Sequence, residues 1–407
     1  MILANATLAG GARADVRLDG PVVAEVATAG TLDGSASLDL SGYVLLPAPA
    51  EPHAHLDKAL TLDRVVEQPG DLGAAIAAWH RERRELPVDD IASRAERAAR
   101  QSLARGTTAI RTHVDVGEGI ELRGVEALID VRDRMRDVVD IQVVALTYPL
   151  AEGPGAADNR SLLREALELG VDVVGGAPHV DADPLRHMQI CLQLAEEFGR
   201  PVDLHMDEHT RPTAIDLGDL ARLVVEGDLG AVAASHCVSL GLQSEAAQLR
   251  IAADVAAAGV SVITCPATNL HLQARDVRTA TPRGLTALWA LLREGVEIAG
   301  GGDNVQDFFH PLGCGDPLQT AALLVLAGQL DPGLSYDLVS RRAREVLGIP
   351  AGGIEAGAPA ELLAVAGDSL QNVLATATED RVVFRRGELV ERTRVVRDNP
   401  GIAIEER

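Results

Sequence analysis

The sequence has few aromatic residues and no long uninterrupted apolar run. Aromatic side chains make up 2% of the 407 residues, so aliphatic side chains must fill the core. No apolar run approaches the length of about 20 residues that a membrane-spanning helix needs. The N-terminal segment also lacks a basic stretch followed by an apolar one, so a signal peptide is not expected. These absences favour a soluble globular protein without a membrane partner.

Cysteine and positive charge are also scarce. The chain has four cysteines and no CxxC pair, which argues against a zinc knuckle or a disulfide framework. Scattered thiols fit a reducing compartment, so we expect a cytoplasmic protein. The net charge of -23 repels phosphate backbones, so nucleic-acid binding is not expected. The PCxxC motif of deaminases that act on nucleic-acid bases is missing as well.

Short apolar runs alternate with longer amphipathic segments from residue 43 onward. Segments such as 90–106 and 184–200 carry apolar residues at helical spacing. Eight runs between such segments predict strands: 43–48, 107–114, 141–147, 171–177, 201–206, 231–236, 260–265 and 296–301. Eight strands alternating with helices predict an α/β fold of the (β/α)₈ TIM-barrel type. A doubly wound open sheet is the alternative, but it would need a Gly-rich phosphate loop after an early strand, and none is evident.

The two ends of the chain have a different pattern. Residues 1–42 alternate apolar and polar side chains between Gly-rich turns, and the C-terminal tail repeats this pattern. We therefore expect both termini to build one small β-sandwich domain. The predicted boundaries are 1–48 with 346–407 for that domain, and 49–345 for the catalytic barrel.

Histidines and an aspartate close several of the predicted strands. His53 and His55 are two residues apart, and alternate residues of a strand face the same side. His205, His236 and Asp303 close three further strands. In a barrel such strand ends meet at one rim, where these folds place their active sites. Imidazole and carboxylate donors suit Zn²⁺ or Fe²⁺, so the residues alone predict a metal site with His236 among its ligands.

Other polar residues near these strand ends are candidates for proton transfer and substrate binding. Glu208 follows His205 by three residues, which suits a proton shuttle, although an exposed loop acid is the alternative. Lys58 is the only lysine, and either substrate contact or a surface salt bridge would explain it. In some two-metal barrels, a carboxylated lysine on a middle strand bridges the two ions. No lysine lies on a middle strand here, so a single metal ion is favoured. His179 also ends a strand and could reach the pocket, whereas His113 is expected to be a hydrogen-bonded structural residue.

The segments "PHAHLDKAL", "DLHMDE", "ASHCVSL" and "GGDNVQDFFHPLG" together resemble the cytosine deaminase-like branch of the amidohydrolase superfamily. The resemblance implies one divalent metal ion, Zn or Fe, and four ligands: His53, His55, His205 and Asp303. It further implies that Glu208 moves protons and that His236 orients the attacking water instead of binding the metal. The expected reaction is hydrolytic deamination of a small nitrogen heterocycle, in which Asp303 also takes part in proton delivery.

Substrate-binding positions depart from those of cytosine deaminases. Tyr148 in "LTYPLAEG" stands where the resemblance leads us to expect a glutamine that reads a pyrimidine amide edge. Asn304 replaces a second aspartate, and Lys58 replaces an uncharged residue. These differences favour a substituted pyrimidine or triazine over cytosine, with Lys58, Tyr148, His179 and Asn304 in contact with it.

Two other functions are compatible with the sequence. The same site could hydrolyse a cyclic or N-acyl amide, which would yield a carboxylate and not free ammonia or amine. A remote alternative is a metal-free, non-catalytic scaffold, but such a protein would be expected to have lost ligands. The sequence leaves the oligomeric state open, a homo-oligomer included.

Overall fold

The computed structural model describes residues 1–34, 37–65, 70–396 and 398. Eight parallel strands follow one another in sequence order around a barrel: β6 (Glu51–Ala54), β7 (Ala109–Val116), β8 (Asp140–Thr147), β9 (Val173–Gly176), β10 (Val202–Met206), β11 (Val232–His236), β12 (Ser261–Thr264) and β13 (Ile298–Gly300). A parallel bridge between Ala54 and Asp303 joins the last strand region to the first and closes the ring. The predicted (β/α)₈ barrel is therefore confirmed.

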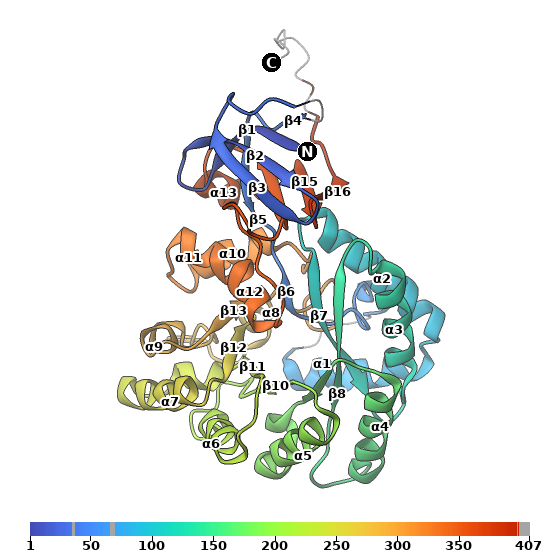
Figure 1. Ribbon diagram of the computed structural model, residues 1–407. Coiled ribbons are helices and arrows are strands. Elements are labelled where there is room, and N and C mark those ends of the chain that lie inside the picture. The colour runs from blue at the N-terminus through green and yellow to red at the C-terminus, as the bar shows by residue number, and fades with distance from the viewer. Residues whose placement is uncertain (35–36, 66–69, 397, 399–407) are drawn as a thin grey trace.

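Helices surround these strands on the outside (Figure 1). The helices that follow the strands are α2 (Val88–Ala104), α3 (Arg123–Met135), α4 (Ala156–Leu169), α5 (Pro184–Phe198), α6 (Leu217–Gly227), α7 (Glu245–Ala257), α9 (Leu288–Arg293), α10 (Pro317–Leu326), α11 (Pro332–Val339) and α12 (Arg341–Val346). In α2, Ile91, Ala95 and Ala98 are buried at helical spacing, while Asp89, Arg97 and Arg100 are exposed. The side chain of Asp183 caps α5 by accepting from the Arg186 N–H. Two further helices, α1 (Leu72–Glu82) and α8 (Pro266–Leu272), carry residues of the site described below.

The two termini form a separate sheet, in which strands from both chain ends lie side by side (Figure 1). Its order is β16 (Glu388–Arg392), β15 (Arg381–Arg385), β14 (Leu362–Ala366), β5 (Tyr43–Pro47), β1 (Ile2–Leu8), β2 (Arg13–Asp19) and β3 (Val22–Thr28), with β4 (Ser37–Asp39) paired to β1. A short helix, α13 (Leu370–Thr376), lies between β14 and β15. The expected small β-domain built from both termini is present, and its boundaries at residues 48/49 and 345/346 stay predictions.

One strand prediction is wrong. The run 43–48 was expected to be the first barrel strand, but it is β5 of the terminal sheet, and the barrel begins at β6. The reason is that β5 is buried on both faces. Val44 and Leu46 pack into the barrel-side core, whereas Leu45 packs into the core of the terminal sheet. A strand between two cores is apolar throughout and has the same pattern as a barrel strand.

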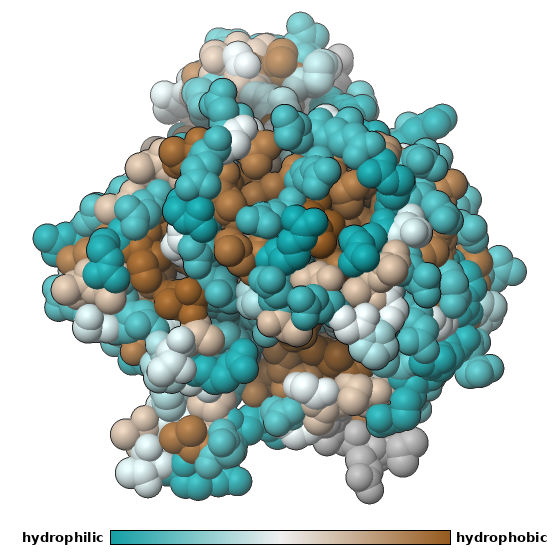
Figure 2. Space-filling model, turned by 90° about the horizontal axis from the view of Figure 1, so that it is seen from below, coloured by the Kyte–Doolittle hydropathy of each residue, from teal (hydrophilic) through white to brown (hydrophobic). Residues whose placement is uncertain are grey.

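Hydrophilic side chains cover most of the face seen in Figure 2, with apolar areas gathered between them. Among the described residues, no helix combines the length and hydrophobicity that crossing a membrane requires. Core positions in the barrel are mostly Val, Leu, Ile and Ala, as the low aromatic content predicts.

Candidate active site

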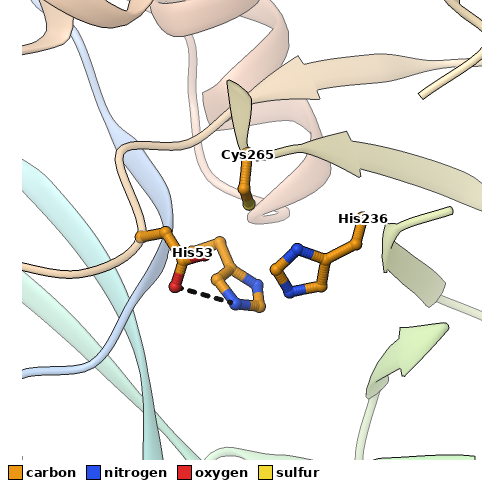
Figure 3. A group of neighbouring side chains, drawn as sticks. His53, His236 and Cys265 are labelled. Carbon is orange, nitrogen blue, oxygen red and sulfur yellow. Dashed lines mark ion pairs between the residues drawn. The ribbon is translucent and has the colours of Figure 1, made fainter. Parts of the chain in front are cut away.

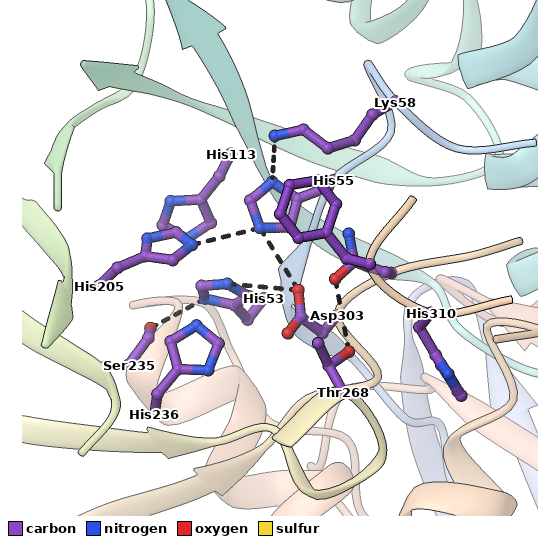
Figure 4. A network of polar contacts seen from close by, with 12 residues as sticks. His53, His55, Lys58, His113, His205, Ser235, His236, Thr268, Asp303 and His310 are labelled. Carbon is purple, nitrogen blue, oxygen red and sulfur yellow. Dashed lines mark hydrogen bonds and ion pairs between the residues drawn. The ribbon is translucent and has the colours of Figure 1, made fainter. Parts of the chain in front are cut away.

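The predicted metal ligands converge at the carboxyl ends of the barrel strands (Figure 4). His53 lies on β6 and His55 directly follows that strand, while His205 lies on β10. Asp303 follows β13 by three residues, and its N–H donates to the His53 carbonyl at 2.9 Å. The four side chains are at most 6% exposed. Residues far apart in the sequence are thus brought to one buried point, as their strand positions predicted.

Two pairs of donor atoms have the spacing of ligands around one ion, and a third pair lies somewhat wider apart. Nε2 of His55 lies 3.2 Å from Nε2 of His205 and 3.3 Å from Oδ1 of Asp303, and Nε2 of His53 lies 3.8 Å from the same oxygen. Two ligands about 2.1 Å from an ion, at angles between 90° and tetrahedral, would be separated by about 3.0–3.4 Å. Within the described residues, Nε2 of His53 and both Asp303 oxygens lack a hydrogen-bond partner although they are buried. The site therefore fits a divalent metal ion.

Hydrogen bonds orient the imidazoles. Nδ1 of His53 lies 2.8 Å from the Ser235 hydroxyl, which donates to Asp203 at 2.9 Å. Since the hydroxyl proton goes to Asp203, the Ser235 oxygen can accept from Nδ1–H, which leaves the lone pair of Nε2 free. Burial, and secondarily neighbouring histidines together with Lys58 in the case of His53 and His55, lower the pKa of His53, His55 and His205 well below the ordinary value. All three are therefore neutral, which is the form that binds metals.

Glu208 and His236 lie beside the predicted ligands. Glu208 is 4% exposed, so the alternative of an exposed loop acid is wrong. Burial, and secondarily the charge of Asp303, raise its pKa well above the ordinary value. Asn269 on α8 holds both groups, because its Nδ2 lies 3.1 Å from Nδ1 of His236 and 3.4 Å from Oε1 of Glu208. A buried, protonated carboxylic acid beside a fixed imidazole can donate a proton to a bound molecule.

A buried ionic network holds Lys58. Its Nζ donates to Asp115 at 2.8 Å and lies 3.3 Å from Nδ1 of His55. Asp115 also accepts from the Trp79 indole at 2.7 Å and from Arg83 at 2.8 Å. Burial alone would lower the pKa of Lys58, but Asp115 and other acids more than offset this effect, so the pKa is raised. Lys58 is 3% exposed, so its ion pair is not the surface salt bridge that was the alternative.

A cavity opens onto these groups. All four residues expected to contact substrate line it: Lys58, Tyr148, His179 and Asn304. Apolar side chains such as Ile76 and Phe309 form other parts of its wall. Nδ1 of His179 must donate to the His205 carbonyl at 3.0 Å, because a carbonyl only accepts; this leaves Nε2 as an acceptor. Burial lowers the pKa of His179 to about 4, which keeps the ring neutral.

Several residues of the site were not found from the sequence. Asp115, Trp79 and Asn269 act through contacts with residues distant in the chain, and only Asp115, two positions after His113 on β7, had a visible pattern. The expected hydrogen bonds of His113 are not confirmed, since neither ring nitrogen has a partner within the described residues. Cys265, directly after β12, also points into the site (Figure 3). Burial raises the pKa of its thiol well above the ordinary value.

Comparisons with known proteins agree with this geometry. The sequence pattern of the Amidohydrolase family matches residues 44–390. Pterin deaminase of Rhizobium rhizogenes is 30% identical over 391 residues, which cover 94% of this chain and 88% of that protein. N-isopropylammelide isopropyl amidohydrolase of Pseudomonas sp. (strain ADP) is 26% identical over 380 residues, which cover 88% of this chain and 89% of that protein. The crystal structure of Klebsiella pneumoniae 5-methylcytosine deaminase liganded with 5-fluorocytosine matches with a TM-score of 0.89 and 27% identity, over 98% of this chain and 99% of that one.

The chain therefore belongs to the amidohydrolase family, whose members use a divalent metal ion. This confirms the resemblance inferred from the motifs. The coverage is nearly complete on both sides, so the family assignment extends over the barrel and the terminal sheet alike.

Proposed function

We propose that this protein is a metal-dependent hydrolase that removes ammonia or an alkylamine from a small nitrogen heterocycle. The observation that carries the proposal is the convergence of His53, His55, His205 and Asp303 beside a buried, protonated Glu208. The relatives support the reaction class, because those reported above are named as deaminases or amidohydrolases of heterocyclic compounds. We propose one metal ion, Zn²⁺ or Fe²⁺, with those four residues as its ligands.

The residues around the metal site would share the proton transfers. The ion would supply a water nucleophile that is activated at neutral pH. Glu208 donates its proton to a ring nitrogen of the substrate, which makes the adjacent carbon electrophilic. His236, fixed through Nδ1 by Asn269, orients the attacking water with its other ring nitrogen. The attacking water gives its protons to Glu208 and Asp303, which then deliver protons to the departing amine, and each positioned transfer contributes about 10²–10⁴ in rate.

The cavity wall suggests how the ring is held. Lys58 can donate to a carbonyl oxygen, and Nε2 of His179 can accept from a ring N–H or an amino group. Tyr148 and Asn304 complete the polar part of the wall. We propose a substituted pyrimidine, a triazine or a related ring as substrate, and a cytoplasmic location in line with the four free cysteines. The oligomeric state is left to measurement, with a homo-oligomer as our working proposal.

The proposal is tested by metal analysis coupled to product analysis. Purified protein is assayed for bound Zn and Fe and then incubated with pyrimidines, triazines, pterins and cyclic ureas. Release of ammonia or amine, lost on chelation and restored by the metal, is the expected result. A new carboxylate without amine release would replace deamination by cyclic-amide hydrolysis. Metal-free protein from metal-replete cells, inactive on every ring, would favour a non-catalytic scaffold.

A further inference from the structure

Cys265 belongs to a second set of metal donors that overlaps the first. His53, His236, Cys265 and Asp303 each place one donor atom within 4.8 Å of the others. Figure 3 shows His53, His236 and Cys265 of this set. All four residues are buried. This set keeps His53 and Asp303 of the proposed catalytic ligands but replaces His55 and His205 by His236 and Cys265. The chain thus has two overlapping sets of possible metal ligands. One has only nitrogen and oxygen donors, and the other also contains a sulfur donor.

The donors of the second set are available. Within the described part of the chain, Nε2 of His53, Nε2 of His236 and both Asp303 oxygens have no hydrogen-bond partner despite their burial. Asn269 Nδ2 donates to Nδ1 of His236 at 3.1 Å, so the neutral ring carries its proton on Nε2, and binding an ion at Nε2 moves that proton to Nδ1. Unpartnered buried polar atoms beside a thiol therefore point to a ligand and not to an isolated cysteine.

We propose that the set formed by His53, His236, Cys265 and Asp303 binds soft, thiophilic cations such as Cd²⁺ and that this binding inhibits the enzyme. Soft sulfur ligands select soft ions, whereas the nitrogen and oxygen set suits harder ones. When the sulfur–metal bond forms, the S–H bond breaks and the proton leaves to solvent, with no electron transfer. The two sets share ligands, so they cannot be filled at once. Cadmium binding would also occupy His236 and remove it from the attacking water.

The test uses enzyme purified with its resident metal, in a Cys314→Ser background that removes the one partly exposed thiol. Cadmium is added while the ultraviolet sulfur-to-cadmium charge-transfer absorption, the released resident metal and the turnover are recorded. We expect the absorption to saturate at one cadmium per chain as the resident metal is released and turnover is lost. Adding Cys265→Ser should abolish the absorption and weaken the apparent cadmium affinity by about 10-fold or more.

Cys191→Ser in the same background is the matched control, because Cys191 is equally buried but lies on α5 and does not belong to the donor set. This variant should keep the absorption. An absorption that persists in the Cys265→Ser variant, or no absorption in any protein, would overturn the proposal. The absorption is measured without substrate, so its outcome is independent of whether the protein deaminates heterocycles; only the loss of turnover rests on the proposed function.

Discussion

Changing Asp115 to Asn would remove the negative charge of this side chain while keeping its shape. In the native protein this carboxylate accepts from Lys58, Trp79 and Arg83 at 2.8, 2.7 and 2.8 Å, and it is 1% exposed. The variant would leave two buried cations without their main counterion. Breaking a buried ion pair costs about 3–5 kcal/mol in the free energy of unfolding. We expect the lower end, about 3 kcal/mol, because Asp57 remains 3.9 Å from Lys58.

The pH dependence of this difference has a definite sign. Burial opposes ionisation of Asp115, but Lys58 and Arg83 outweigh it and lower its pKa below the ordinary value. A lowered carboxyl pKa stabilises the fold at any pH above the unfolded-state pKa, and the stabilisation is lost as pH falls toward the native-state pKa. The part of the difference that comes from Asp115 should therefore be constant from neutral pH to about pH 5 and shrink only below about pH 4.

Urea unfolding at several pH values measures the effect, followed by circular dichroism and by tryptophan fluorescence, with metal content held equal. Glu197→Gln is the matched control, because Glu197 makes the same kind of pair with Arg164 but both side chains are more than 40% exposed. That variant should change stability very little. Equal effects of the two variants, or a difference that already vanishes near pH 6, would refute the reasoning from burial.

Three further predictions concern the site. Glu208→Gln should leave the metal bound and lower kcat by about 10²–10⁴, since the amide keeps the shape but has no proton to give; near-normal turnover would contradict its role. His205→Ala should empty the metal site, because it removes one of the four proposed ligands, and stoichiometric metal in the purified variant would argue against that ligand set. Tyr148→Phe should change the ranking of substrates while metal content stays the same; an unaltered ranking would remove the hydroxyl from substrate recognition.

The sequence predicted the barrel and its rim well because these depend on local patterns. Buried parallel strands are continuous apolar runs, and polar residues at their carboxyl ends must meet at one rim, so His205 and Asp303 could be placed without knowing any contact. The assignment of 43–48 failed because a strand between two cores has the same local pattern as a barrel strand. Asp115 was not recognised as the partner of Lys58, since their contact spans 57 residues of chain and follows only from the pairing of β6 with β7.

The different roles proposed for Glu208 and Asp303 follow from their surroundings. Glu208 and Asp303 are both buried, and the charge of Asp303 helps to raise the pKa of Glu208, so the two carboxyl groups resist ionising together. A divalent cation held by His53, His55, His205 and Asp303 would favour the ionised form of its own ligand, Asp303, because a bound ion is the largest local charge. Glu208 would then remain the protonated member of the pair. Neighbouring carboxyls driven to opposite protonation states indicate which is the acid and which the base, and this supports the proposal that Glu208 donates the proton.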